Sequence, residues 1–387
     1  MVFLSPCKIL FGSISSEKIS TFLKESGYSH PLIITDSFIG NSPILKNLTE
    51  PLSISGINYV TYTDIEIEPT TDSIDKLRAF YHLGQFDIII ALGGGSVIDS
   101  AKALSIMESF GGDYTDWHIP NTPTGKVIPV LSVPTIAGSG SETTNACVLR
   151  SSLDQSIIIF ASDACISSAV FIDHELTMSV PSTLLAVTGI DALTHALEAY
   201  TSILANDFSD MFALEAVRLL SQNLRPAFND PTNMSAKKSL MIGSMIAGYA
   251  FSNAGLTLIH GMSGPISAHF GIPHALSNAI LLPTLHRYCA NGATSKYAVL
   301  ARTILPRLEN ESDETACEEL IKELSALNNE LQIPTLSSLD INESEYVSVL
   351  DTLADEALQL GLIQNCPFVP SHTQIVDLYK QCWSEKW

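Results

Sequence analysis

Short apolar runs alternate with amphipathic stretches in the first half of the chain. Residues 31–36, 86–92 and 127–133 are rich in aliphatic side chains and are predicted to be buried strands. Between them, residues 73–81 and 97–104 have the mixed polar and apolar pattern of helices. Strands that alternate with helices form βαβ units, so this half is predicted to fold as an α/β domain around a parallel sheet.

The pattern changes near residue 180, because apolar residues from there on recur at helical spacing. Helices are predicted over residues 184–200, 210–220, 237–250, 277–289 and 313–328. The last of these is acidic and amphipathic, which is typical of a surface helix. We therefore predict two domains, an α/β domain over residues 1–180 and an all-helical domain over residues 181–387.

Composition narrows the class of protein. The chain has 387 residues, of which 46% are hydrophobic and 16% charged, so it can bury two sizeable cores. Its net charge of −21 repels phosphate groups, which argues against nucleic acid and anionic membrane surfaces as partners. It has no run of about 18 uncharged apolar residues, so no membrane span is predicted.

The seven cysteines are scattered, odd in number and without a CxxC pair. They are Cys7, Cys147, Cys165, Cys289, Cys317, Cys366 and Cys382. This pattern is typical of free thiols in a reducing compartment. The first residues lack a basic segment followed by a long apolar stretch, so no signal peptide is predicted and the expected location is cytoplasmic.

A glycine-rich turn, Gly93-Gly94-Gly95-Ser96, joins a predicted strand to a predicted helix. Glycines let a phosphate approach the backbone, and the free N–H groups at the start of a helix point at the anion. Three successive glycines exceed what a plain tight turn requires, so phosphate binding is the favoured interpretation. Ser96 and Asp99 also have the spacing of a capping box for this helix.

Two further features follow predicted strands. Residues 134–142, rich in small and hydroxylated side chains, are interpreted either as a nucleotide-lining loop or as an ordinary polar loop. Asp36 ends the strand over residues 31–36. Its carboxylate can bind an adenosine ribose and repel a 2′-phosphate, or it can cap the next helix, and the local sequence does not choose between these roles.

Four side chains in the helical half form a candidate metal site. Asp191 and His195 lie four residues apart on one face of an apolar helix, where stranded polar groups cost several kcal/mol. They can satisfy each other or bind an ion. His260 follows an apolar helical stretch, and His274 follows Pro273 in the predicted first turn of a new helix.

Imidazoles from two other helices can complete a site begun by a carboxylate and an imidazole. On the residues alone, however, His269, His286 and His174 remain alternative ligands.

Five segments of the chain resemble the iron-containing (group III) alcohol dehydrogenase family. They are GGGSVIDSAKA (93–103), PTIAGSGSE (134–142), FIDHELTMSVP (171–181), TGIDALTHALEAY (188–200) and HGMSGPISAHFGIPHALSNAILLP (260–283). They span most of the chain in the family's order. The resemblance implies an N-terminal dinucleotide-binding domain, an all-helical C-terminal domain, an active site in the cleft between them and a homodimer.

The resemblance also assigns residues of the helical half. It implies that a divalent ion, usually Fe²⁺ and sometimes Zn²⁺, is bound by Asp191, His195, His260 and His274. The substrate, a small alcohol, aldehyde or ketone, is expected near Phe251 and Gly264, with residues 360–370 as a further part of the pocket wall.

For the cofactor, the resemblance assigns the pyrophosphate to the glycine-rich turn and its helix, at Gly94, Gly95, Ser96 and Asp99. It implies that the nucleotide is lined by Thr135, Ser139 and Thr144. Asp36 matches the family position whose carboxylate disfavours NADP, so NAD is the expected cofactor.

Three positions depart from the family pattern. Gly264 stands where members often have a second histidine near the nicotinamide, and Glu68 stands where they have an asparagine before Pro-Thr. A lysine that often follows the PTxAGxGSE loop is missing, since no lysine occurs between Lys126 and Lys237. These departures bear on cofactor affinity and proton transfer, and none removes a metal position.

The predicted activity is that of a metal-dependent, NAD-linked alcohol dehydrogenase or aldehyde or ketone reductase. The ion is expected to act as a Lewis acid on the substrate oxygen while hydride passes to or from nicotinamide. One alternative is a lyase that resembles dehydroquinate synthase, which needs basic residues for a substrate phosphate that this helical half supplies sparsely. The other is a nucleotide-binding protein without turnover.

Overall fold

The computed structural model describes residue 5 and residues 8–386, and it divides into two compact units between Ser179 and Val180. We call them the N-terminal unit and the C-terminal unit. Each of the six cysteines in the described part carries a free thiol, as predicted, while Cys7 and most of the N-terminal segment assessed for a signal peptide lie outside the described residues.

The N-terminal unit is built on a six-stranded sheet in the order β1-β8-β5-β4-β2-β3, in which every pair is parallel. The strands are β1 (Ile9–Phe11), β2 (Pro31–Asp36), β3 (Val60–Ile65), β4 (Ile88–Gly93), β5 (Val130–Pro134) and β8 (Ala169–Ile172). The predicted parallel sheet is confirmed. Strand β2 has the predicted bounds, whereas β4 and β5 begin two or three residues later than predicted.

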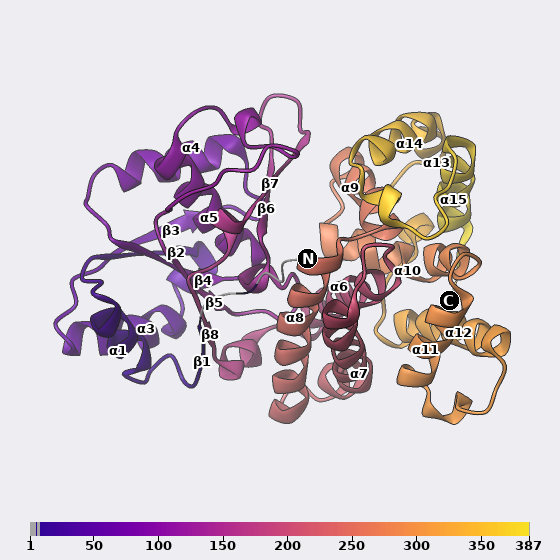
Figure 1. Ribbon diagram of the computed structural model, residues 1–387, viewed down its shortest axis with the longest axis horizontal. Helices are drawn as coiled ribbons and strands as arrows, with labels where there is room; N and C mark the ends of the chain where they lie inside the picture. Colours follow the sequence, from indigo (N-terminus) through magenta and orange to yellow (C-terminus); the bar gives the residue numbers. More distant parts are fainter. Residues whose placement is uncertain (1–4, 6–7, 387) are drawn as a thin grey trace. The chain divides into compact units, whose positions relative to one another are not determined.

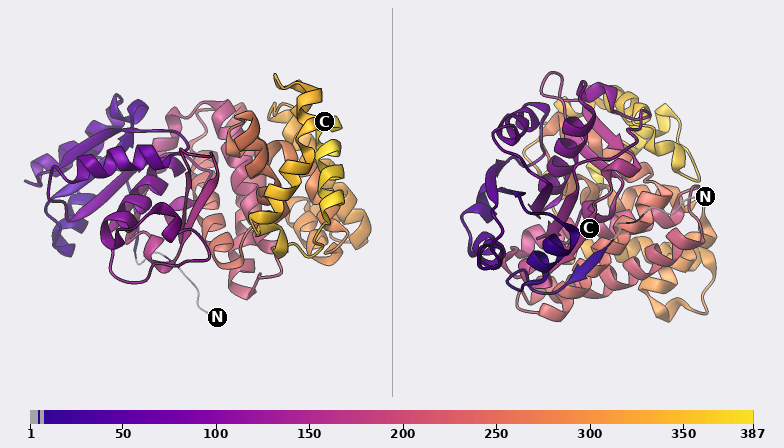
Figure 2. Two further views of the ribbon diagram at one scale, coloured as in Figure 1. Left: turned by 90° about the horizontal axis from the view of Figure 1, so that it is seen from above. Right: turned by 60° about the vertical axis from the view of Figure 1, so that its left-hand side comes forward.

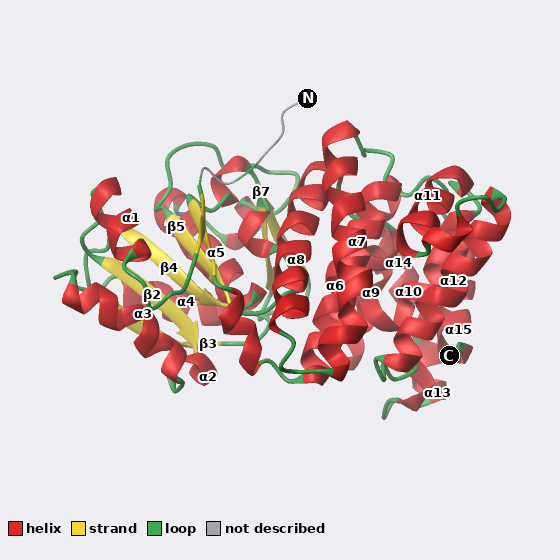
Figure 3. Ribbon diagram, turned by 90° about the horizontal axis from the view of Figure 1, so that it is seen from below, coloured by secondary structure: helices red, strands yellow, loops and turns green. Residues whose placement is uncertain are grey.

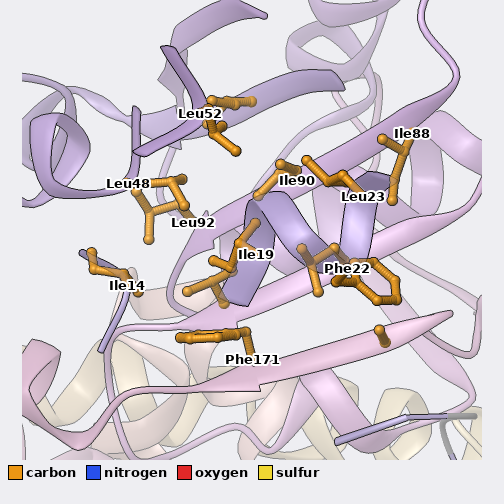
Figure 4. Packing of buried hydrophobic residues seen from close by; sticks show 14 of the residues in the cluster. Ile14, Ile19, Phe22, Leu23, Leu48, Leu52, Ile88, Ile90, Leu92 and Phe171 are labelled. Atoms are coloured by element: carbon orange, nitrogen blue, oxygen red, sulfur yellow. The ribbon is translucent and has the colours of Figure 1, made fainter. Parts of the chain in front are cut away.

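Helices cover both faces of this sheet, because its strands are apolar on both sides. Ile33 and Ile90 point to the face covered by α1 (Lys18–Ser26) and α3 (Pro43–Ile54). Figure 4 shows Ile90 there, beside residues such as Leu23 and Leu52. Their neighbours Ile34 and Ala91 point to the other face, where α4 (Thr71–Tyr81) and α5 (Gly95–Phe110) pack (Figure 1).

The direction of strand addition reverses between β2 and β4, since β3 lies beyond β2 while β5, β8 and β1 lie beyond β4. Ligands of open α/β sheets bind at such a switch point, outside the carboxyl ends of the strands. The residues at these ends are Asp36 on β2 and Gly93 on β4. The fold therefore places both predicted cofactor-binding features at the edge where this topology favours a ligand.

Some elements of the N-terminal unit were not predicted. They include the short helix α2 (Ser37–Gly40) and the antiparallel hairpin of β6 (Ala146–Arg150) and β7 (Ile157–Ala161). The hairpin follows the loop over residues 134–142 and bears on the site below.

Every helix predicted in the C-terminal unit is present, and each is longer than predicted. They are α6 (Ser182–Thr201), α7 (Asp207–Asn229), α8 (Met234–Ala254), α10 (His274–Ala290) and α12 (Asp313–Glu330). The others are α9 (Leu258–Phe270), α11 (Thr294–Ile304), α13 (Glu343–Ser348), α14 (Leu350–Gln359) and α15 (His372–Ser384). Helices α6, α7 and α8 pack side by side, and α10 packs on α6, α9 and α12 (Figures 1 and 2).

The described part of this unit contains no strand (Figure 3). The expectation that His260 follows a helical stretch was wrong, because α8 ends at Ala254, Gly255 adopts a positive φ of 72°, and His260 lies in the first turn of α9. Within the described residues, no single helix is long and apolar enough to span a membrane. Helices α8 and α9 pass that test only together, and the chain bends by 104° between them.

Candidate functional site

Helix α6 brings Asp191 and His195 onto one buried face. The helix is enclosed on nearly all sides from Gly189 to Thr201, so polar groups on it need partners within the protein. Asp191 Oδ1 lies 3.8 Å from His195 Nε2, which is too long for a hydrogen bond. The two side chains therefore converge on a common point without satisfying each other.

Two further helices supply the remaining predicted imidazoles. His260 on α9 places Nε2 3.7 Å from Asp191 Oδ1, and its ring stacks on that of His195 at 4.6 Å between centroids. His274 is the first residue of α10, directly after Pro273, as predicted. Its ring centroid lies 5.3 Å from that of His260. All four predicted ligands thus gather in one cluster, in which Asp191, His195 and His260 offer ligand atoms within 4.8 Å of one another.

Asn278 joins His274 to the rest of the cluster. It lies one turn after His274 on α10, and its Nδ2 is 3.1 Å from His274 Nε2. The same nitrogen is 2.7 Å from Asp191 Oδ1 and 3.0 Å from His260 Nε2. The sequence analysis missed Asn278, although its helical spacing of four from His274 was a usable signal.

Glu198 is a second residue that the sequence analysis missed. It is fully buried on α6, three residues after His195, and its Oε2 forms a very short contact with His260 Nδ1. Its other oxygen, Oε1, accepts hydrogen bonds from Thr257 Oγ1 and from the Ile259 backbone N–H, both at 2.7 Å. The spacing of three from His195 could have placed it on the same face of the helix.

Burial opposes charge on each of these groups, and the neighbouring charges decide the direction of the pKa. Burial lowers the pKa of His195 to about 4. Burial alone would raise the pKa of Asp191, but the charges of His195, His274 and His260 outweigh it and lower that pKa. Burial also works against charge on Glu198 and on His260, yet their mutual attraction lowers the pKa of Glu198 and raises that of His260.

The alternative ligands lie elsewhere. His269 is exposed, and its Nε2 lies within hydrogen-bond distance of Glu356 Oε1, at 3.0 Å. His286 Nδ1 forms a hydrogen bond of 2.7 Å with the Tyr297 hydroxyl. His174 belongs to the N-terminal unit. Among the described residues, none of the three joins the cluster of possible ligand atoms around Asp191.

Two residues are expected near the substrate. Phe251 lies beside this cluster, and Gly264 is close to His260 in the sequence. The Phe251 ring stacks on His195 at 4.5 Å between centroids, with 28° between the ring planes. Gly264 is buried one turn after His260 on α9. Phe251 therefore presents an apolar surface directly against a cluster imidazole.

The donor set fits a divalent transition ion. Three imidazoles and one carboxylate are ligands that both Fe²⁺ and Zn²⁺ accept in proteins. The buried Nδ1 of His195 has no hydrogen-bond partner among the described residues. His195 is thus held by ring stacking on Phe251 and His260 rather than by hydrogen bonds, which leaves Nε2, the nitrogen nearer Asp191, for an ion.

The glycine-rich turn lies at the end of β4 and against the second predicted loop. Gly94 is the N-cap of α5 with an extended backbone, so Ser96 and Asp99 both lie inside the helix and the predicted capping box is wrong. A Cβ on Gly95 would lie 2.7 Å from Ser139 Oγ, and the Thr135 N–H donates to the Gly93 carbonyl at 3.1 Å. The first contact favours glycine at position 95, and both contacts bring the two loops together.

A buried lysine that the sequence analysis missed, Lys102, holds the backbone of residues 141–146 by hydrogen bonds. Lys102 Nζ donates to the Ser141, Thr144 and Ala146 carbonyls at 2.6 to 2.9 Å and to Thr144 Oγ1 at 3.1 Å. Asp99 accepts from Ser141 Oγ and, at 3.2 Å, from the Val148 N–H. Asp99 and Thr144 therefore anchor the loop, and their predicted contact with the cofactor stays a prediction.

Asp36 is the N-cap of α2, with Oδ1 accepting from the Ile39 N–H at 2.9 Å. The capping role is therefore present. It uses one carboxylate oxygen at the carboxyl end of β2, which leaves Oδ2 for a ligand hydroxyl.

Glu68, which departs from the family pattern, lies next to the glycine-rich turn. Glu68 has a positive φ of 53°, and its backbone N–H donates to Ser96 Oγ at 3.2 Å. Its carboxylate is paired with Arg150 Nη2 at 2.7 Å. The unpredicted hairpin thus supplies a cation that neutralises the extra acidic group.

Comparisons with known proteins agree over both units. Residues 6–174 match the model for iron-containing alcohol dehydrogenases, and residues 185–383 match the model for the C-terminal part of that family. The chain is 34% identical over 366 residues to long-chain-alcohol dehydrogenase 1 of Geobacillus thermodenitrificans strain NG80-2, which covers 92% of this chain and 91% of the relative. It is 29% identical to lactaldehyde reductase of Escherichia coli K12, over 96% of this chain and 97% of that protein.

Among solved structures, 1,3-propanediol oxidoreductase superposes with a TM-score of 0.94 at 29% identity. The match covers 98% of this chain and 99% of the other. The likeness therefore extends over both units.

Proposed function

The chain belongs to the iron-containing alcohol dehydrogenase family, and from this premise we propose that Asp191, His195, His260 and His274 hold its divalent ion. The convergence of these four side chains from α6, α9 and α10, three of them buried, supports the proposal most directly. Fe²⁺ is the proposed ion, with Zn²⁺ as the alternative that the same donors accept.

The protein is an oxidoreductase that interconverts alcohols with aldehydes or ketones. The ion, when bound, supplies Lewis acidity toward the substrate oxygen, and the nicotinamide accepts or donates the hydride. The chain's own contribution is to bury Asp191, His195 and His260, to hold the exposed His274 next to them, and to place the apolar ring of Phe251 against His195. We propose that Phe251 and Gly264 border the substrate, so that carbon chains pack against an apolar wall.

We propose that the cofactor binds at the switch point of the sheet. Its pyrophosphate would face Gly94, Gly95 and Ser96, where the start of α5 offers free N–H groups. Thr135 and Ser139 belong to the adjoining loop, and Asp99 and Thr144 position that loop from behind. The carboxylate of Asp36 supports NAD as the preferred cofactor, because it repels a 2′-phosphate.

Protein purified without chelator tests this proposal. We expect elemental analysis to find Fe²⁺ or Zn²⁺, and we expect short alcohols to give NADH faster than NADPH. Chelation should abolish turnover, and restoring the ion should recover it. Full activity of metal-free protein would refute the metal assignment. Tight NAD binding without oxidation of any alcohol would favour the binding protein without turnover, and consumption of a phosphorylated substrate without net NADH would favour the lyase.

The homodimeric state and the cellular location stay predictions. Light scattering of the purified protein tests the first directly.

A further inference from the structure

The carboxylate of Glu198 touches one cluster imidazole from behind. Glu198 shares α6 with Asp191 and His195, and its side chain is fully buried. Oε2 contacts Nδ1 of His260, the ring nitrogen on the side away from Asp191. A carboxylate placed in this way can act on the cluster without being one of its ligands.

The direction of each hydrogen bond at Glu198 is fixed by chemistry. The Ile259 backbone N–H can only donate, and an ionised carboxylate can only accept. His260 Nδ1 must therefore carry the hydrogen that it shares with Oε2, and the neutral ring, which is the form that binds an ion, then keeps its lone pair on Nε2.

We infer that Glu198 is a positioning residue that fixes the tautomer and orientation of His260 and so aims its Nε2 lone pair at the ion. The inference rests on the proposed function. Glu198 also brings a second negative charge to the site, so that Asp191 and Glu198 together balance the two charges of a divalent ion in a buried environment. Removing that charge is expected to weaken binding of the ion rather than only the fold.

A purely structural role must be distinguished from this one, because Glu198 also satisfies the N-terminus of α9 through Thr257 and Ile259. The substitution Glu198→Gln separates the two roles. The amide oxygen of glutamine has to face the Ile259 N–H, since an amide nitrogen there would put two donors together. Its NH₂ group then faces His260 Nδ1, which must accept, so the hydrogen of the neutral ring moves to Nε2 and blocks it as a ligand.

Thr257→Val is the matched control. It removes one hydrogen bond from the same carboxylate while leaving the Glu198–His260 contact intact. If Glu198 only stabilises the start of α9, Thr257→Val should lower the thermal stability of the metal-free protein, whereas Glu198→Gln, which keeps an oxygen facing the Ile259 N–H, should leave both that stability and metal binding unchanged. If Glu198 tunes His260, only Glu198→Gln should change the bound ion.

The experiment measures Zn²⁺ and Co²⁺ affinity of the full chain by competition with a chromophoric chelator, together with the visible absorption of the Co²⁺ form. We expect Glu198→Gln to bind about 10- to 100-fold more weakly and to change the Co²⁺ spectrum. Thr257→Val should keep the affinity and spectrum of the unmodified protein. Unchanged affinity and spectrum in Glu198→Gln would overturn this inference alone, whereas absence of divalent-ion binding by the unmodified protein would overturn the proposed function as well.

Discussion

The candidate sites of the two units are formed by different kinds of chemical group. In the N-terminal unit, the candidate nucleotide site consists of strand ends, glycines and backbone N–H groups, and its side chains mostly hold loops in place. In the C-terminal unit, the candidate metal centre consists of side chains that converge from three buried helices. The first site depends on backbone shape, and the second depends on the identity of a few ionisable groups.

This difference predicts that a substitution can abolish nucleotide binding without loss of the ion, and the reverse. A change that alters backbone shape at Gly95 should leave the ion in place, and a change that removes a carboxylate from α6 should leave nucleotide binding in place. The following variants test that separation, from the largest expected effect to the smallest.

Asp191→Ala removes the carboxylate that three of the cluster contacts share. We expect loss of the bound ion and a fall in turnover of about 1000-fold, as expected when about 4 kcal/mol of transition-state stabilisation is lost. Elemental analysis and NADH formation measure these effects, while calorimetry should find NAD affinity unchanged. Retention of the ion by this variant would remove Asp191 from the ligand set.

His286→Asn addresses stability in the C-terminal unit. Burial lowers the pKa of His286 to about 4, so the unfolded chain takes up a proton near pH 6.5 that the folded chain refuses. The destabilisation caused by His286 is therefore absent above pH 6.5 and reaches about 3 kcal/mol as the pH drops to about 4. In the variant, which can still bond to Tyr297, urea unfolding of the metal-free protein should show a shallower acid slope.

Glu142→Gln is the counterpart in the N-terminal unit and should act in the opposite direction of pH. Burial raises the pKa of Glu142 to about 7, so its contribution to the free energy of unfolding is full below about pH 4.5 and is lost as the pH rises through 7.

For the earlier variant, equal acid slopes in His286→Asn and the unmodified protein would show that His286 is protonated in the folded state.

Gly95→Val tests the backbone-shaped site. A Cβ at Gly95 would lie 2.7 Å from Ser139 Oγ, so the two loops must separate. Overpacking of about 2 kcal/mol corresponds to a loss of NAD affinity of about 30-fold. Metal content serves as the internal control and should stay that of the unmodified protein, whereas simultaneous loss of the ion would mean that the two sites are coupled.

Asp36→Asn has the smallest expected effect. Asparagine keeps the oxygen that caps α2 but removes the charge, so the local fold should persist. We expect the ratio of kcat/KM for NADP to that for NAD to rise about 10-fold, as expected for relief of about 1.4 kcal/mol of repulsion. An unchanged ratio would assign Asp36 to capping alone.

The sequence predicted most about features that repeat along the chain. The apolar run of β2, the helix that carries Asp191 and His195, and the change of pattern near residue 180 all follow from local periodicity. The position of Asp36 at a switch point needed the strand order, which no local pattern contains. The hairpin that brings Arg150 to Glu68 was missed for the same reason, because that pairing joins residues far apart in the chain.

The residues missed at the metal centre have a different explanation. Glu198 and Asn278 are single polar positions on apolar helices, and each acquires its role only when a second helix reaches it. Without that contact, a buried glutamate or asparagine has no distinguishing signal beyond its spacing. The four metal ligands were assigned by resemblance, and their role as ligands stays a prediction that metal analysis must test.

Helix α6 carries Asp191, His195 and Glu198 within eight residues, so the rotational phase of a single helix sets both the inner donors and the group behind His260. One residue inserted at Ala196 would turn everything after it by about 100°. Asp191 and His195 would keep their directions, while Glu198 would swing away from His260. The number of residues between His195 and Glu198 is therefore as much a part of the site as the side chains themselves. Substitutions of the two residues between them should disturb the site far less than an insertion there.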